Sequence, residues 1–223
     1  MDPTSFRMFM AAASAEAGLP DIGAAYEGGY YAGSISQNAD GVATHALVVS
    51  DKSVEVSRKY RTVNVGSTDA KSTYDGAANQ SSNTGTDHPA FNYCANLTEG
   101  GYSDWYLPSL YELEIAYYNL KPSADSNNTS YGSNSYAVPS RSSNYTTTNP
   151  GQTSVTAFQY PSGSECFHGS NATGDGTEDR YHTSTEMSSD STRNLHIRFQ
   201  DGRQDDDPKT RTRKVRPFRK VAL

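Results

Sequence analysis

The clearest pattern of hydrophobic positions along the chain predicts one amphipathic helix at residues 109–120. Its apolar side chains recur at helical spacing, and they are Leu110, Leu113, Tyr117 and Leu120. Ser109 followed by Glu112 is a capping box, in which the two side chains satisfy backbone amides of the first turn. Pro122 ends the helix, because the residue before a proline disfavours the helical conformation. The segment is therefore predicted to be a core helix and to carry no catalytic group.

Shorter patterns before this helix predict strands, turns and a second helix. The expected elements are strands at 28–35 and 44–49 around a turn at Asp40-Gly41, extended chain between 54 and 65, a turn at 74–79 and a short helix at 88–98. In the second helix, Phe91 and Cys94 are expected to face inward. Two short helices therefore lie between flanks that are rich in strands.

The last forty residues alternate apolar and polar positions, which is typical of strands. We expect strands at 181–186, 195–199 and 214–221, with Asp201-Gly202 as a turn. Pro217 confines the closing strand to a sheet edge or a bulge, because proline has no backbone donor. Together with the early hairpin, this predicts an α+β domain with small antiparallel sheets, whose two ends pair.

Residues 123–180 lose the periodic pattern and are dominated by Ser, Asn, Thr, Gly and Tyr. Composition alone is typical of a disordered linker. Aromatic residues recur through the region like anchors, and they are Tyr131, Tyr136, Tyr145, Phe158, Tyr160 and Phe167. Long loops within compact domains tend to be functional, and this residue mixture is typical of adaptable binding surfaces. We therefore favour a long ordered binding loop.

Residues 1–25 form a separate apolar, helix-favouring segment that is too short to fold alone. Its largest apolar side chains are Phe6, Met8, Phe9 and Met10. The alternatives are a frayed terminus and a short helical arm that packs on a partner or on the domain. We interpret it as an attachment arm, which divides the chain into an arm at 1–25 and a domain at 26–223.

Composition narrows the classes of function. The net charge of −6 argues against general nucleic-acid binding. From Arg193 onward, ten Lys and Arg face four Asp, so this part carries +6 and the remainder −12. Such a basic strip fits an acidic partner or phosphate, or else the solvated face of strands. No export signal is recognisable and no apolar run reaches the length that a membrane span needs.

The sequence offers few candidates for chemistry. Cys94 and Cys166 lack the spacing of a zinc site, and we expect both to be reduced. Asp205, Asp206 and Asp207 are adjacent, but neighbouring carboxylates on a strand point to opposite faces. The five histidines are scattered, and neither a nucleophile motif nor a phosphate-binding loop occurs. We therefore expect no enzyme activity, no metal and no cofactor.

Three motifs resemble those of a known family. Asp104–Leu113 (DWYLPSLYEL) resembles the "D-W-x-L-P-[ST]-x-x-E-L" signature of the Lcl C-terminal-like domain family, and Tyr181–Glu186 (YHTSTE) resembles its "Y-W-S-S-T-E" strand. Phe199–Gly202 with Val215–Arg219 is similar to its closing "F-x-D-G … V-R-x-V-R". The resemblance covers roughly residues 28–221. His182 stands where the family has tryptophan, and Cys166 stands where a small residue is expected.

The resemblance implies a C-type-lectin-like fold and a binding module on a phage virion or a bacterial adhesin. The leading hypothesis is a non-enzymatic virion protein in a tail, fibre or surface appendage that binds a host-surface glycan or protein and forms homo-oligomers. Its arm would contact other virion proteins. Candidate receptor contacts are Tyr131, Tyr136, Tyr145, Tyr160, His168 and Arg180. The alternatives are a purely structural decoration, collar or baseplate protein, and an enzyme that acts on glycans or protein side chains.

Overall fold

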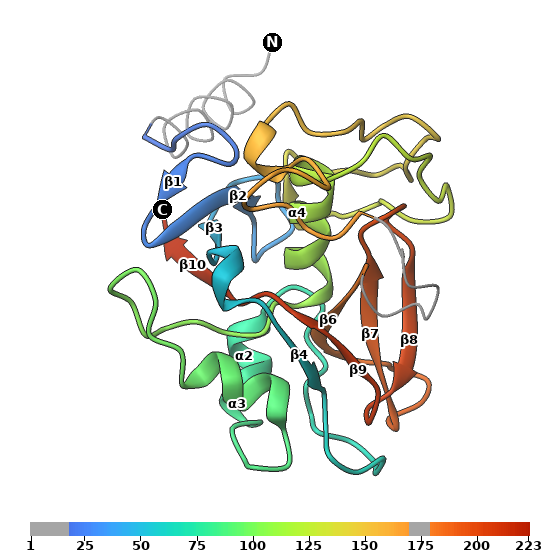
Figure 1. Ribbon diagram of the computed structural model, residues 1–223. Helices are drawn as coiled ribbons and strands as arrows, with labels where there is room; N and C mark the ends of the chain where they lie inside the picture. Colours follow the sequence, from blue (N-terminus) through green and yellow to red (C-terminus); the bar gives the residue numbers. More distant parts are fainter. Residues whose placement is uncertain (1–17, 170–178) are drawn as a thin grey trace.

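The chain has an α+β fold in which short strands outnumber helices. The structure is a computed structural model, and it describes residues 18–169 and 179–223 (Figure 1). Its helices are α2 (Gly76–Ser81), α3 (Pro89–Ala95) and α4 (Leu110–Leu120), with 3-10 turns η1 (Lys52–Val54) and η2 (Thr156–Phe158). Two five-stranded sheets lie on different sides of α4, which contacts strands of both.

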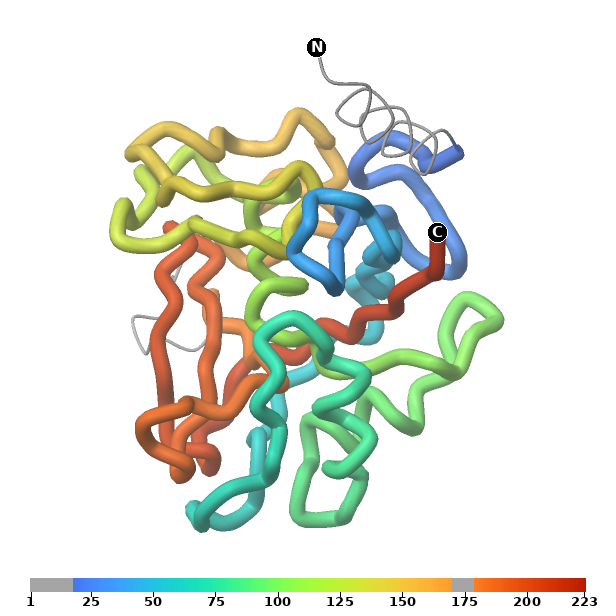
Figure 2. Tube along the Cα trace, turned by 180° about the vertical axis from the view of Figure 1, so that it is seen from behind, coloured from blue at the N-terminus to red at the C-terminus, as the bar shows by residue number. Residues whose placement is uncertain are grey.

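The first sheet joins the two ends of the described chain. Its strands are β1 (Ala25–Tyr26), β2 (Gly29–Ile35), β3 (His45–Val49) and β10 (Phe218–Ala222) in that order, with β5 (Ala137–Val138) paired to β2. The β2–β3 hairpin is antiparallel, as predicted from the turn at Asp40-Gly41. Figure 2 shows the C-terminal strand running beside the blue strands of this sheet. The prediction that the two ends pair is confirmed.

The second sheet is built mainly from the C-terminal part of the chain. Its order is β4 (Val56–Lys59), β9 (Thr212–Val215), β6 (Arg180–Glu186), β7 (Arg193–Arg198) and β8 (Gln204–Pro208). All neighbours are antiparallel except β6 and β9. The predicted strands at 181–186 and 195–199 are confirmed within one or two residues at their ends.

Three details of the predicted elements were wrong. The expected strand at 214–221 is two strands, β9 and β10, which belong to different sheets because the chain crosses between them at Pro217. The expected turn at 74–79 contains helix α2, which starts because the Asp75 side chain accepts a hydrogen bond from the Ala78 amide at 2.9 Å. The acidic run at 205–207 lies in strand β8, which the alternation pattern did not predict.

Helix α4 carries the predicted apolar stripe into the core, and all four stripe residues are buried. The predicted capping carboxylate is present, because Glu112 accepts a hydrogen bond from the Ser109 amide at 2.7 Å. Unlike an ordinary surface helix, α4 also buries acidic groups: Glu112 and Glu114 are both 0% exposed. The helix is therefore enclosed by the two sheets and by the long loop.

The motifs of the family resemblance contact one another around the start of α4. The Ser184 amide on β6 donates to the Pro108 carbonyl at 2.7 Å, and the Leu110 amide donates to the Thr185 hydroxyl at 3.0 Å. Tyr106 and Phe218 form an isolated β-bridge. These three segments, which are far apart in the sequence, therefore form one part of the core.

The cations of the basic C-terminal part of the chain are all paired with carboxylates of the protein, and Asp207 and Glu55 each serve two of them. Each of its ten cations has a carboxylate oxygen within 4.0 Å. The pairs are Arg193–Asp206, Arg198–Asp201, Arg203–Asp205, Lys209–Glu186, Arg211–Asp207, Arg213–Asp207, Lys214–Glu55, Arg216–Glu55, Arg219–Asp104 and Lys220–Asp75. The strip is therefore neither a free surface for an acidic partner nor simply a solvated face, because carboxylates from several elements fold against it.

The proposed attachment arm lies mostly outside the described residues, and Phe6, Met8, Phe9 and Met10 all fall there. Within the described part of the chain, no helix has the length and apolar character needed to cross a membrane.

His182 on β6, which stands where the related motif has tryptophan, is buried and neutral. Its Nδ1 accepts a hydrogen bond from the Asn194 side-chain amide at 2.9 Å, so the proton sits on Nε2, which donates to the Arg211 carbonyl at 3.2 Å. The Asn194 amide also donates to the Leu195 carbonyl at 3.0 Å, which fixes its orientation. Burial lowers the pKa of His182 to about 3.

We expect the protein to lose stability as the pH falls below about 6.5, the ordinary pKa of histidine. In that range His182 takes up a proton in the unfolded chain while it stays neutral in the folded one. The unfolded state then binds more protons, and the free energy of unfolding falls by up to about 1.4 kcal/mol per pH unit for this one group. Urea unfolding at pH 7, 6 and 5 measures the slope. A His182→Gln variant should have a shallower slope, and an unchanged slope would contradict the assignment.

Candidate functional site

The long loop is folded in its described part, residues 123–169. Strand β5 pairs it with β2, and η2 forms a turn in its second half. The anchors Tyr145, Phe158 and Phe167 are buried in the main core, as the spacing of aromatic residues predicted. Figure 1 shows the loop, in yellow-green to orange, gathered at one end of the molecule above α4. The region is therefore an ordered part of the domain and not a linker.

A single buried carboxylate on α4 connects three points of this loop. Glu114 Oε2 accepts a hydrogen bond from the Asn134 side-chain amide at 2.6 Å and forms an ion pair with Arg141, and Oε1 accepts from the Tyr145 hydroxyl at 2.5 Å. Burial raises the pKa of Glu114, and the positive charge of Arg141 opposes that rise. The loop conformation thus depends on one charged group in the core.

Two adjoining hollows open where the loop meets the outer side of α4. The smaller has a volume of about 230 Å³ and the larger about 560 Å³, and both are lined by Tyr118 and Asn149. The smaller is otherwise lined by loop residues 141–145, and the larger by Asp21, Ile22, Asn119 and residues 150–155. Together they are within the size range of small-molecule sites.

Apart from the exposed carboxylate of Asp21 in the larger hollow, the groups in these hollows suit an uncharged polar ligand. The Arg141 guanidinium lies over the Tyr118 ring, with its carbon 4.0 Å from the ring centroid, and its charge is already paired with Glu114. Asn149 and Asn144 are exposed and offer side-chain amides, which donate and accept hydrogen bonds. An aromatic ring beside amides and hydroxyls is a chemistry that recognises sugar or peptide surfaces.

Two of the predicted contact residues pack in or against the main hydrophobic core. Tyr145 is only 4% exposed, because its ring packs against Tyr117 and its hydroxyl is bound to Glu114. Tyr131 is half-buried against the main core, and its carbonyl accepts a hydrogen bond from the Tyr145 amide at 2.7 Å. Tyr145 therefore supports the loop from within, although it also forms part of the floor of the smaller hollow.

Tyr136 belongs to a separate aromatic stack. Its ring lies 4.2 Å from the ring of Tyr74, with an interplanar angle of 7°, and 5.6 Å from the ring of Tyr111. The three half-buried rings join the start of α4, the chain before α2 and the chain before β5. The Tyr136 ring is thus stacked with two other rings of the protein.

The last three predicted residues lie near β6. The rings of Tyr160 and His168 are 5.9 Å apart, and His168 Nε2 lies 3.7 Å from Glu55 Oε1. Arg180 is half-buried and opens strand β6, opposite Arg198 in the register of β7. The six predicted contact residues therefore lie in several parts of the structure. Tyr145 is the only one of the six that lines either hollow.

Sequence reasoning missed Tyr118, Arg141 and Asn144 as surface groups. Tyr118 follows directly on Tyr117 of the apolar stripe, so helical spacing places it on a different face. Arg141 is the only Lys or Arg between Lys121 and Arg180. A lone cation in a long polar loop was a usable sign of a specific partner, which is Glu114.

The described residues contain no group of three or more His, Cys, Asp or Glu side chains arranged to hold a metal ion. Cys94 and Cys166 are both buried and unbridged, as expected for a reduced pair. Burial raises the pKa of the Cys94 thiol well above its ordinary value. Cys94 is thus a small buried apolar group rather than a nucleophile.

Comparison with known proteins adds no assignment. No protein-family model matches the chain, and no curated protein is similar to it at a significant level.

Proposed function

We propose that the chain is a non-enzymatic bacteriophage virion protein whose C-type-lectin-like module binds a host-surface glycan or protein. The observation that carries the proposal is the pair of adjoining hollows built by the long loop on α4, with Tyr118 and Asn149 at their junction. Their lining is aromatic and amide-rich, and the loop that forms them is anchored in the core by Glu114. The three motifs of the family resemblance supply the virion context.

In this proposal the ligand lies across both hollows. The Tyr118 ring, backed by Arg141, would contact an apolar face of a sugar ring or a side chain. The amides of Asn144 and Asn149 would bind hydroxyl or carbonyl groups and fix the orientation of the ligand. The part of segment 1–25 that precedes residue 18 would attach the protein to other virion components, since Asp21 and Ile22 line the larger hollow and Ala25 lies in β1. Homo-oligomers would present several such sites at once.

The test is binding of the purified full chain to intact cells of the host, with and without a chelator. Saturable binding that survives the chelator is expected. The double variant Asn144→Ala/Asn149→Ala should weaken it at least about tenfold, since two hydrogen bonds to the ligand are lost. Both side chains are exposed, so thermal stability should be unchanged.

The matched control is Asn64→Ala, which changes another exposed asparagine in the segment after β4, and it should bind like the unaltered protein. Absence of binding to every host that the parent particle infects would overturn the receptor proposal. The structural alternative, a decoration, collar or baseplate protein, would then account for the fold.

A further inference from the structure

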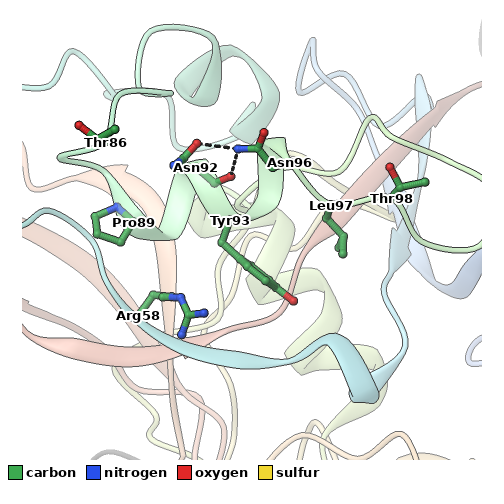
Figure 3. Close-up of a pocket in the computed structure, with 8 residues that line it drawn as sticks. All are labelled: Arg58, Thr86, Pro89, Asn92, Tyr93, Asn96, Leu97 and Thr98. Carbon is green, nitrogen blue, oxygen red and sulfur yellow. Dashed lines mark hydrogen bonds between the residues drawn. The ribbon is translucent and has the colours of Figure 1, made fainter.

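A second concave site lies on a different part of the molecule, between α3 and β4. It is a groove of about 620 Å³, and its walls are formed by Arg58, Pro89, Asn92, Tyr93, Asn96 and Thr98 among others. Figure 3 shows Arg58 rising from the strand toward Tyr93, with the asparagines on the helix above them. Neither the long loop nor α4 contributes to it, so it is separate from the hollows described above.

The groove contains a positive charge that the protein does not neutralise. Arg58 makes no ion pair with any residue that the structure describes, and its guanidinium donates a hydrogen bond to the Ser57 carbonyl at 3.0 Å. This differs from the C-terminal cations, all ten of which have carboxylate partners. A guanidinium has five donors in a planar fork, which matches the two oxygens of a carboxylate.

The Tyr93 ring beside Arg58 is held in place. Its hydroxyl donates to the Val54 carbonyl at 2.5 Å, and the Arg58 guanidinium carbon lies 5.5 Å from the ring centroid. A ring that is fixed at both its hydroxyl and its backbone loses little entropy on binding, so it can support a ligand face at low cost.

The asparagines of α3 add directional hydrogen-bonding groups. The Asn96 side-chain amide donates to the Asn92 side-chain oxygen at 2.6 Å and to the Asn92 carbonyl at 2.7 Å (Figure 3). These bonds use the Asn96 nitrogen and the Asn92 oxygen, and they leave the Asn92 nitrogen as a donor and the Asn96 oxygen as an acceptor with no hydrogen bond inside the described chain. A donor beside an acceptor matches neighbouring sugar hydroxyl groups, because each hydroxyl both donates and accepts hydrogen bonds.

We propose that this groove binds an acidic saccharide through a sugar carboxylate. Arg58 binds the carboxylate in a bidentate pair, the Tyr93 ring supports the sugar face, and Asn92 and Asn96 bind hydroxyl groups. A second binding site for a charged sugar gives one protein two contacts of different chemistry on the same glycan-covered surface, which raises avidity without a stronger single contact.

Calorimetric titration of the full chain tests the proposal with two matched probes. One is a glucuronic-acid-terminated trisaccharide, and the other is the same trisaccharide with its carboxylate reduced to an alcohol. Saturable binding of the acidic probe and at least about tenfold weaker binding of the reduced probe are expected, because a charge-assisted hydrogen bond is lost. Equal affinity for both probes, or binding of neither, would overturn the proposal.

Two single variants separate the Arg58 contact from the general effect of charge. Arg58→Gln should weaken binding of the acidic probe at least about tenfold. Lys59→Gln removes the same charge from the adjacent residue, which points to the opposite face of β4, and should have little effect. An equal loss in both variants would mean attraction to net charge only and would overturn the site. Stronger binding of a sugar phosphate than of the uronic acid would overturn the carboxylate assignment.

The two binding sites can be tested independently. The double variant Asn144→Ala/Asn149→Ala should retain full affinity for the acidic trisaccharide, while Arg58→Gln should retain the loop-dependent contact with cells. Loss of acidic-sugar binding in the loop variant would contradict the separation of the groove from the hollows.

Discussion

Replacing Glu114 with alanine is expected to lower the free energy of unfolding by about 3–5 kcal/mol. The side chain is 0% exposed and has partners at three positions of the long loop, namely Asn134, Arg141 and Tyr145. Alanine leaves the mostly buried Arg141 charge unpaired and removes the acceptor of the Tyr145 hydroxyl. Each of these groups then has the desolvation cost of burial without the interaction that offset it.

The same substitution should also remove binding at the loop hollows. Arg141 is 15% exposed in its side chain and is held over the Tyr118 ring by its ion pair with Glu114. When that ion pair is lost, the position of loop residues 141–145 relative to the Tyr118 ring is no longer fixed. We therefore expect loss of cell binding together with loss of stability, whereas the Asn144→Ala/Asn149→Ala variant should lose binding alone.

Unfolding of the unaltered protein and of the Glu114→Ala variant in guanidinium chloride measures the change in the free energy of unfolding. The control is Glu99→Ala, because the Glu99 carboxylate makes no hydrogen bond or ion pair within the described chain. That variant should stay within about 0.5 kcal/mol of the original protein. A loss of less than about 1 kcal/mol in Glu114→Ala would contradict the role of Glu114 as the anchor of the loop.

Local patterns predicted the elements that depend on neighbouring residues. Helical spacing and the capping box identified α4, and alternation around a turn identified the β2–β3 hairpin. Aromatic spacing also identified Phe158 and Phe167 as core anchors of the loop. In each case the information lies within about a dozen residues, because the periodicity of one element reports which of its faces is buried.

The features that were missed depend on partners far away in the sequence. Strand β8 contains Asp205, Asp206 and Asp207, whose composition disfavours a strand, and it forms because β7 supplies the pairing edge and arginines supply opposite charges. The burial of Glu114 could not be read from α4, because its main ionic partner is 27 positions away. Charge composition likewise predicted a basic strip without revealing the carboxylates that fold against it.

The prediction of the receptor contacts was limited for the same reason, because it also depended on parts of the chain that are far apart in the sequence. Tyrosine content and spacing predicted an ordered loop, but they could not distinguish tyrosines that anchor it from tyrosines that it exposes. Tyr145 was predicted to face a ligand and lies in the core, whereas Tyr118 was assigned to no role and lines both hollows. The difference is set by which side of α4 the loop covers, and that is a property of the tertiary structure.

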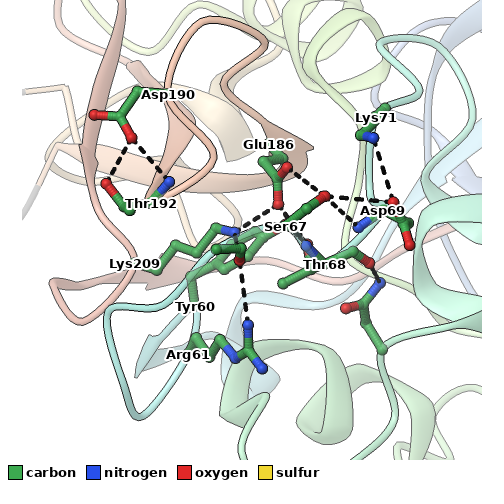
Figure 4. A network of polar contacts seen from close by, with 12 residues as sticks. Tyr60, Arg61, Ser67, Thr68, Asp69, Lys71, Glu186, Asp190, Thr192 and Lys209 are labelled. Carbon is green, nitrogen blue, oxygen red and sulfur yellow. Dashed lines mark hydrogen bonds and ion pairs between the residues drawn. The ribbon is translucent and has the colours of Figure 1, made fainter.

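A second buried charge pair joins the loop after β4 to the second sheet. Lys209 and Glu186 are 0% and 2% exposed in their side chains, and Lys209 Nζ lies 2.5 Å from Glu186 Oε2. The Glu186 carboxylate also accepts from the Thr68 amide at 2.7 Å and from the Ser67 hydroxyl at 2.9 Å (Figure 4). Lys209 donates in addition to the Gly66 carbonyl at 3.1 Å. The pair therefore fixes residues 66–68 against β6.

Replacing Lys209 alone with methionine is expected to destabilise the protein by about 3–5 kcal/mol, because Glu186 is left buried without its counter-charge. Replacing both residues, as Lys209→Met/Glu186→Leu, should recover much of this loss, since an apolar pair of similar volume avoids the cost of burying two charges. The recovery stays incomplete, because the Thr68 amide loses its acceptor.

Urea unfolding of Lys209→Met, Glu186→Leu and the double variant completes a double-mutant cycle that isolates the pair. A double variant that is no more stable than Lys209→Met would mean that the hydrogen bonds of Glu186 to residues 67 and 68, and not its pairing with Lys209, carry the stability of this junction. Recovery in the double variant assigns the charge pair a conformational role: it fixes where the loop after β4 lies while adding little net stability over an apolar pair.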